Sequence, residues 1–393
     1  MGRIKRILID QLEIGMYVAE LNKERLAAYN LDKYGPVLGQ DILDQIFALG
    51  ISHIYIDIDK GINSVYGVPV DLLDETSQEK NNNPVEFDRE LRQAKLLQEG
   101  ATILVDQVMK DIKLGNTMNV AGLEDLADGL LTSITNNQNA LACITRLREK
   151  DRYLLEHSFS VGVLMGILAR SMGFSGDVLH QMVTGALLHD IGKIMVPDAV
   201  LHKSGKLEAE EWEEMKRHVP YGRQVLDTTP GIAFVAKEIC SQHHERLDGS
   251  GYPQGLPAGD ISLHGRMTAI VDVYDAITAD RVYHEGMTPN EAMKKLMELS
   301  GCHLDKDLVY QFIRCMSIYP VGSLVQLNSG KIALVLEANQ LKQDKPRVKV
   351  IYSARERLYL PIECIDLARP WVTESIKTSV DPKHYGINLA NFL

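Results

Sequence analysis

Seven side chains able to bind metal ions follow one another in a fixed order through the middle of the chain. Each is an imidazole or a carboxylate, the donors that suit transition metals. The seven residues are His157, His189, Asp190, His218, His243, His244 and Asp272. A lone histidine is more often an ordinary core or surface residue than a ligand, but so many donors on separate segments predict a shared site. They exceed the ligands that one ion needs, so we expect two ions.

A glycine-rich string follows the histidine pair almost directly. It reads Asp248-Gly249-Ser250-Gly251-Tyr252-Pro253. Glycine and proline could form no more than a tight turn, but the closeness of the string to the donors favours a role in shaping a substrate groove. The donors and the string together point to a metal-dependent phosphohydrolase. In such a site a hydroxide bridging two ions attacks phosphorus in line, while positive charge stabilises the phosphoryl oxygens, so no separate nucleophile is needed.

Helical periodicity surrounds most of these donors. We expect helices over residues 154–164 around His157, 178–189 ending at His189, 211–218 ending at His218 before Pro220, 232–240 before His243, and 269–277 around Asp272. Side chains at the end of one helix can point into a cavity that another helix faces. The segment around Asp272 is apolar nearly all round, and a carboxylate there is costly to bury unless it is paired or binds a metal.

The other segments predict a mainly α protein, in which a helical catalytic domain lies between a small α+β domain and a short β-rich appendage. Ile51–Ile58 alternates apolar and polar residues as a strand does. Phe87–Leu114 has apolar residues at helical spacing, and the polar run that ends at Pro84 predicts a flexible linker. The expected domains are residues 1–75 (α+β, regulatory), 76–86 (linker), 87–148 (helical connector), 149–316 (catalytic) and 317–393 (β-rich appendage and tail).

The composition argues against several classes of protein. The chain has 42 basic and 53 acidic residues and a net charge of −11, which argues against a general binder of nucleic-acid polymers. Its five cysteines are scattered and form no CxxC pair, as is typical of a reducing compartment. No stretch approaches the ~20 apolar residues of a membrane span. We therefore expect a cytoplasmic bacterial protein without membrane insertion.

Three strings resemble the HD-GYP subgroup of the HD-domain phosphohydrolases. They are His189-Asp190-Ile191-Gly192-Lys193, His243-His244-Glu245 and Asp248-Gly249-Ser250-Gly251-Tyr252-Pro253. The likeness continues through Gly255-Leu256, Ile261, Arg266, residues 272–276 and residues 281–283, and covers about residues 150–316. The segment ahead of it, with Gly15-Met16-Tyr17-Val18 and Ile54-Tyr55-Ile56-Asp57, resembles the uncharacterised domain often found before HD-GYP domains.

This resemblance implies a phosphodiesterase that hydrolyses cyclic di-GMP, a bacterial second messenger, to linear pGpG or onward to GMP. It implies one ion held by His157, His189, Asp190 and Asp272, and a second held by Asp190 as a bridge together with His218, His243 and His244. Iron is typical of the family, and manganese is also used. Asp190 and Lys193 are the expected catalytic residues, with Lys193 on a substrate phosphate and with Tyr252, Arg266 and Arg281 along the substrate groove.

The sequence departs from the family pattern at two places. Some members have a glutamate four residues before the first histidine, which supports a third metal. Here that residue is Tyr153, so we expect a two-metal site. The usual Arg-Pro-Tyr-Lys/Arg string reads Arg281-Val282-Tyr283-His284, and the loss of the proline and of a permanent cation lowers the expected substrate affinity.

Two other functions stay open. The chain could hydrolyse another cyclic dinucleotide or a nucleotide monophosphate, because no sequence feature selects guanine over adenine. It could also be a catalytically weak sensor that binds cyclic di-GMP and acts through protein partners at the N-terminal domain or the Gly-Tyr-Pro surface, although the complete donor set argues against this. The helix over residues 87–114 could form a homodimer or pack on the catalytic domain, and the N-terminal domain could gate access, mediate dimerisation or sense a signal.

Overall fold

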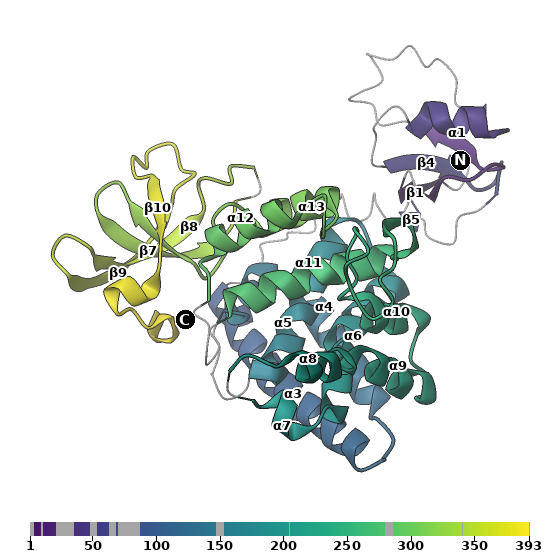
Figure 1. The fold of residues 1–393 in the computed structure, drawn as a ribbon. Helices are drawn as coiled ribbons and strands as arrows, with labels where there is room; N and C mark the ends of the chain where they lie inside the picture. Colours follow the sequence, from purple (N-terminus) through teal and green to yellow (C-terminus); the bar gives the residue numbers. More distant parts are fainter. Residues whose placement is uncertain are drawn as a thin grey trace. The chain divides into compact units, whose positions relative to one another are not determined.

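The computed structural model divides the chain into two compact units, Met1–Asn83 and Pro84–Leu393 (Figure 1). It describes residues 4–8, 11–20, 35–47, 53–62, 68–69, 87–146, 153–203, 205–279, 286–339 and 341–392. The expected linker, residues 76–86, lies outside the described residues, and the proposed domain boundaries stay a prediction.

The N-terminal unit contains a five-stranded antiparallel sheet. Its strands are β1 (Ile4–Leu8), β2 (Tyr17–Glu20), β3 (Gly35–Pro36), β4 (His53–Asp57) and β5 (Val68–Pro69), in the order β3-β2-β4-β1-β5, and helix α1 is Gln40–Phe47. Ile7 of β1 lies opposite Ile54 of β4, and both are buried with Met16 and Val18. The alternating pattern around Ile54 therefore buries one face of the sheet, as the sequence predicts.

Two long helices begin the second unit. Helix α3 (Phe87–Lys113) and helix α4 (Val120–Ile144) pack along each other. Asn119 caps α4 by accepting a hydrogen bond from the backbone N–H of Gly122 at 3.1 Å. Leu91 of α3 and Leu130 of α4 are buried in a core that later helices share. The expected helix over residues 87–114 is confirmed.

The remaining helices form a bundle around α5 (Figure 1). They are α5 (Tyr153–Ser171), α6 (Gly176–Leu188), the 3-10 helix η4 (Ile191–Met195), α7 (Asp198–Leu201), α8 (Ala209–Lys216), α9 (His218–Thr228), α10 (Phe234–Gln242), the 3-10 helix η5 (Ala258–Asp260), α11 (Leu263–Thr278), α12 (Pro289–Leu299) and α13 (Lys306–Met316). Helix α5 contacts α3, α4, α6, α11 and α13, which explains why it is buried on almost every side. None of the helices within the described ranges is long and apolar enough to cross a membrane.

One expected helix end is wrong. The sequence predicted that Pro220 halts a charged helix ending at His218, but α8 ends at Lys216 and α9 begins at His218. Pro220 lies in the first turn of α9, where backbone N–H groups have no acceptor within the helix and a proline costs little. His218 therefore stands at the start of a helix.

A second five-stranded antiparallel sheet follows the bundle. Its strands are β6 (Leu324–Leu327), β7 (Lys331–Glu337), β8 (Arg347–Ser353), β9 (Leu358–Asp366) and β10 (Ile376–Val380), in the order β10-β6-β7-β8-β9, and the 3-10 helices η6 (Pro382–Tyr385) and η7 (Leu389–Phe392) end the chain. The β-rich C-terminal region is confirmed. The sequence missed β9 and β10, which are the edge strands and bury few side chains, so their apolar pattern is weak.

Candidate metal centre

Five segments of the helical bundle bring the seven predicted donors together. His189 and Asp190 directly follow α6, His218 begins α9, His243 and His244 directly follow α10, and α5 and α11 carry His157 and Asp272. The donor atoms form two groups, one of His157, His189 and Asp272 and the other of Asp190, His218, His243 and His244. Within each group all donor atoms lie within 4.8 Å of one another, and His244 alone among the seven is not fully buried.

The first group is centred on His157. Its Nε2 atom lies 3.2 Å from Nε2 of His189 and 3.1 Å from Oδ1 of Asp272. Nε2 of His189 lies 3.9 Å from the same Asp272 oxygen. Two imidazole nitrogens and one carboxylate oxygen therefore face a common point.

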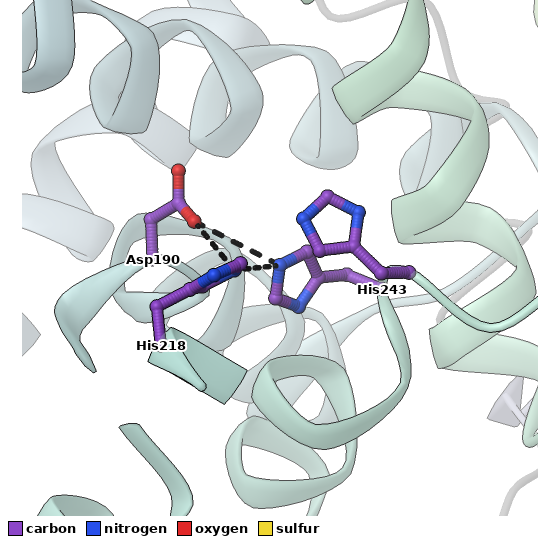
Figure 2. A group of neighbouring side chains, drawn as sticks. Asp190, His218 and His243 are labelled. Atoms are coloured by element: carbon purple, nitrogen blue, oxygen red, sulfur yellow. Dashed lines mark hydrogen bonds and ion pairs between the residues drawn. The ribbon is translucent and has the colours of Figure 1, made fainter. Parts of the chain in front are cut away.

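The second group surrounds one oxygen of Asp190. Figure 2 shows the Asp190 carboxylate facing the rings of His218 and His243. Oδ1 of Asp190 lies 3.3 Å from Nε2 of His218 and 3.8 Å from Nε2 of His243, and the two Nε2 atoms are 3.4 Å apart. The ring of His244 lies beside that of His243, tilted by 44°, with 4.1 Å between the ring centroids.

Asp190 connects the two groups through its two oxygens. Oδ1 faces His218 and His243, whereas Oδ2 lies 3.5 Å from Nε2 of His157 and 3.3 Å from Nε2 of His189. The carboxylate is buried, and Oδ1 has no hydrogen-bond donor among the described residues. A buried carboxylate oxygen without a donor is costly, and a cation on each side would stabilise both oxygens.

Outer hydrogen bonds orient four of the imidazoles. In each, Nδ1–H donates to an acceptor: His157 to Oδ2 of Asp275 at 2.6 Å, and His189, His218 and His243 to the backbone carbonyls of Ala186, Met215 and Cys240 at 2.8, 2.7 and 2.8 Å. A carbonyl can only accept, so Nδ1 carries the hydrogen and the neutral ring presents a lone pair at Nε2. This arrangement of outer partners is typical of metal-binding histidines.

Once His157 has released its proton, the donors of the site face one another without hydrogens between them. Lone pairs of His157 and His189 meet at 3.2 Å, and those of His218 and His243 meet at 3.4 Å. Carboxylate oxygens of Asp190 and Asp272 complete the ring of acceptors. Positive charge between these acceptors favours such a buried arrangement, and the nitrogen and oxygen donors fit a pair of metal ions.

The electrostatics of the two groups differ. Burial opposes the charged form of His157, but hydrogen bonds and charge from Asp272 and Asp275 outweigh it and raise its pKa to about 9. Burial lowers the pKa of His218, His243 and His244, that of His244 to about 3. Neutral imidazole is the form that binds metal, so these rings are ready to act as ligands, whereas His157 must release a proton.

The pKa of the bridging carboxyl is shifted in the direction that favours metal binding. Burial favours the neutral form of Asp190. The charge of Lys193 and the charge and hydrogen bond of His189 outweigh this effect and hold the pKa of Asp190 well below the ordinary value. Nζ of Lys193 lies 2.5 Å from Oδ2 of Asp190. Asp190 is therefore ionised, with a cationic side chain already beside it.

Gly192 explains why Asp190 and Lys193 stand next to α9. A Cβ atom at Gly192 would collide with the carbonyl oxygen of His218 and with the backbone of Gly222. Only glycine lets η4 approach α9 this closely. The two glycines thus bring Asp190 against His218.

The Gly-Tyr-Pro loop borders the second group. The ring centroid of Tyr252 lies 4.6 Å from that of His244 and 6.3 Å from that of His218. Trp212 of α8 contacts the other side of the tyrosine, with 6.1 Å between centroids. Tyr252 is thus beside the site, in a place where it can contact a substrate held there.

The sequence reading missed two supporting carboxylates. Asp275 accepts from His157, and its position three residues after Asp272 on a helix was a signal that both face one side. Glu245 is buried and accepts the backbone N–H groups of Gln254 at 2.8 Å and Leu256 at 2.9 Å. Glu245 therefore fixes the Gly-Tyr-Pro loop from within. The spacing of residues in the sequence does not predict this role.

Arg266 and Arg281 were also expected along the substrate groove. Arg266 is paired with Asp305 at 2.8 Å, between α11 and the start of α13. Arg281 lies outside the described residues, as does the string 281–284 around it. Cys240 is fully buried, as expected of an apolar thiol, and burial raises its pKa.

Comparisons with known proteins identify families that match this chain. A family model for the HD domain matches residues 141–308, and one for a domain of unknown function (DUF3391) matches residues 4–123. A cyclic di-GMP phosphodiesterase of Pseudomonas aeruginosa is 35% identical over 95% of this chain and 91% of its own length. The 3'3'-cGAMP-specific phosphodiesterase 2 of Vibrio cholerae is 43% identical over 36% of this chain and 27% of its own length.

A solved structure of an HDG"Y"P protein from Bdellovibrio bacteriovorus covers 79% of this chain and 98% of its own, with 19% identity and a TM-score of 0.49. The HD-domain match and the gathered histidines and aspartates define a metal-dependent phosphohydrolase. The chain belongs to the HD-GYP phosphodiesterase family, with the DUF3391 domain at its N-terminus.

Proposed function

We propose that this enzyme hydrolyses cyclic di-GMP to linear pGpG or onward to GMP, using two metal ions. The substrate is supported by the Pseudomonas aeruginosa cyclic di-GMP phosphodiesterase, which is similar over nearly the whole chain. The observation that carries the mechanism is the position of Asp190, whose two oxygens face two separate groups of donors. All donors in the two groups are nitrogen or oxygen, which suits iron and, alternatively, manganese.

Each residue of the site has a separate role in the proposed reaction. The two groups of donors would hold the ions, which when bound would lower the pKa of water for attack on phosphorus and neutralise charge on the phosphate. Asp190 holds the two groups at a fixed separation, and Asp275 keeps the ring of His157 turned toward the site. Lys193, with its ammonium beside Asp190 and its side chain 20% exposed, is placed to move onto a phosphate oxygen. Tyr252 offers its ring or hydroxyl to the nucleotide from the loop that Glu245 fixes.

A second substrate is favoured by one observation. The Vibrio cholerae relative named for 3'3'-cGAMP is 43% identical over 143 residues of this chain. Mixed guanine–adenine dinucleotides are therefore the competitor to test. We also propose a cytoplasmic location, and a homodimer or a signalling partner at the Gly-Tyr-Pro surface, which fractionation and light scattering of the purified protein would test.

The experiment is anaerobic purification followed by metal analysis and turnover assays with cyclic di-GMP, 3'3'-cGAMP and cyclic di-AMP. We expect about two ions of iron or manganese per chain and the highest kcat/KM on cyclic di-GMP. Asp190→Ala should lose metal and turnover while keeping its circular dichroism spectrum. Binding of cyclic di-GMP without turnover by the iron-loaded protein would support a sensor and overturn the proposal, as would full activity of metal-free Asp190→Ala.

A further inference from the structure

A third group of metal-binding side chains lies outside the centre described above. It consists of Asp248, which precedes the Gly-Tyr-Pro turn, and Cys302 and His303, which lie between α12 and α13. Their donor atoms all lie within 4.8 Å of one another. Asp248 and Cys302 are exposed and His303 is half-buried, so an ion can reach the group from solvent.

Asp248 turns one oxygen toward the other two residues. Its Oδ1 accepts the backbone N–H of Ser250 at 3.0 Å and the Ser250 hydroxyl at 2.7 Å. Its Oδ2 is left facing Sγ of Cys302 and Nε2 of His303, each at 3.5 Å. The serine thus fixes the carboxylate in the orientation that a shared ion requires.

The backbone holds the two loops in register. Leu247 donates its N–H to the carbonyl of His303 at 3.1 Å, which ties the loop after α10 to the loop after α12. The N–H of His303 donates to the carbonyl of Leu299 at 3.0 Å, and that of Gly301 to the carbonyl of Leu304 at 2.8 Å. These backbone bonds hold together the two segments that carry the three donors, and none of them uses a donor side chain.

The separations match a tetrahedral ion. With bonds of about 2.0 Å to nitrogen and oxygen and about 2.3 Å to sulfur, neighbouring corners of a tetrahedron are roughly 3.3 to 3.5 Å apart. The sulfur–oxygen and nitrogen–oxygen separations here are both 3.5 Å. A thiolate, a carboxylate and a neutral imidazole together carry two negative charges, which balance a divalent cation.

We propose that Asp248, Cys302 and His303 form a separate site for one zinc ion, with solvent at its fourth position. Sulfur, nitrogen and oxygen donors in tetrahedral geometry favour zinc, whereas the seven donors of the hydrolytic centre offer no sulfur. A zinc ion bound at this site would link the loop that carries Tyr252 to the connection between α12 and α13. The inference does not depend on which nucleotide the enzyme hydrolyses.

Cobalt(II) tests the site because it replaces zinc and gives a near-ultraviolet charge-transfer band only when a thiolate is bound. We expect cobalt titration of the reduced full-length protein to produce this band in the wild type. The band should be absent in Cys302→Ser and at least tenfold weaker in His303→Ala at the same cobalt concentration. Zinc-saturated Cys302→Ser should contain one equivalent less zinc than the wild type.

Two controls separate this site from the rest of the molecule. Cys364→Ser removes another exposed thiol, on β9, and should keep the full band. Asp190→Ala disables the hydrolytic centre and should also keep it. The proposal is overturned if the wild type shows no thiolate band, or if the band and the zinc content of Cys302→Ser equal those of the wild type.

Discussion

Oδ2 of Asp275 accepts a hydrogen bond from Nδ1 of His157 at 2.6 Å, and both side chains are buried. The pair links a carboxylate that is not one of the seven donors to a ring that faces both His189 and Asp272. The hydrogen bond fixes the tautomer of His157 and strengthens the basicity of its Nε2 atom.

Asp275→Asn should weaken metal binding at the His157 group. The amide keeps the size of the side chain but removes the charge that polarises the imidazole, and losses of outer partners typically cost about 10- to 100-fold in metal affinity. Competition with a chelator measures the change. Asp177→Asn, on the exposed first turn of α6, is the matched control and should bind metal as the wild type does. Equal affinities in the two variants would contradict this role of Asp275.

Metal affinity should depend on pH through His157. Its pKa, raised to about 9 by Asp272 and Asp275 against the effect of burial, means that the ring is protonated at neutral pH before an ion binds. Binding displaces that proton, so affinity should rise by about tenfold per pH unit between pH 7 and 9 and then level off. Chelator competition across this range measures the slope. An affinity that is flat with pH would show that no proton is released.

Lys193→Ala should lower turnover and leave the metal content unchanged. The ammonium lies beside Asp190 but is not one of the donors, so its loss removes positive charge near the phosphate and no ligand. Removing one such charge-stabilising group costs about 100-fold or more in kcat. Lys203→Ala, which breaks an ion pair with Glu211, is the control and should remain active. Loss of metal from Lys193→Ala would instead assign the lysine a structural role.

Glu245→Gln should disturb the Gly-Tyr-Pro loop. The buried carboxylate accepts two backbone N–H groups, whereas an amide presents one oxygen and one NH₂, so one N–H loses its acceptor at a cost of about 1–3 kcal/mol. We expect a lower thermal midpoint and a higher KM, because Tyr252 is less firmly placed, with the metal content unchanged. An unaltered KM would show that the Gly-Tyr-Pro loop does not contribute to substrate binding.

The sequence predicted the donors because imidazole and carboxylate chemistry is carried by residue type. It also predicted the helices that hold them, since apolar spacing marks buried faces such as that of α11. The start of α9 was missed because Pro220 reads as a helix end when the first turn is not known. Asp190 faces both groups of donors because η4 approaches α9 closely at Gly192. Atomic positions reveal this approach, whereas the spacing of residues in the sequence does not.

Supporting residues were harder to predict than ligands. Asp275 and Glu245 act through other groups, and their type alone does not distinguish them from surface acids. The edge strands β9 and β10 bury few side chains, so the alternation that identified β7 and β8 is weak there.

Anomalous diffraction from crystals of the anaerobically purified, iron- or manganese-loaded protein tests the central claim most directly. We expect two peaks about 3.5–4 Å apart, one on each side of the Asp190 carboxylate. One peak should lie among His157, His189 and Asp272, and the other among His218, His243 and His244. A single peak with the second group turned away from it, or peaks distant from Asp190, would contradict the account.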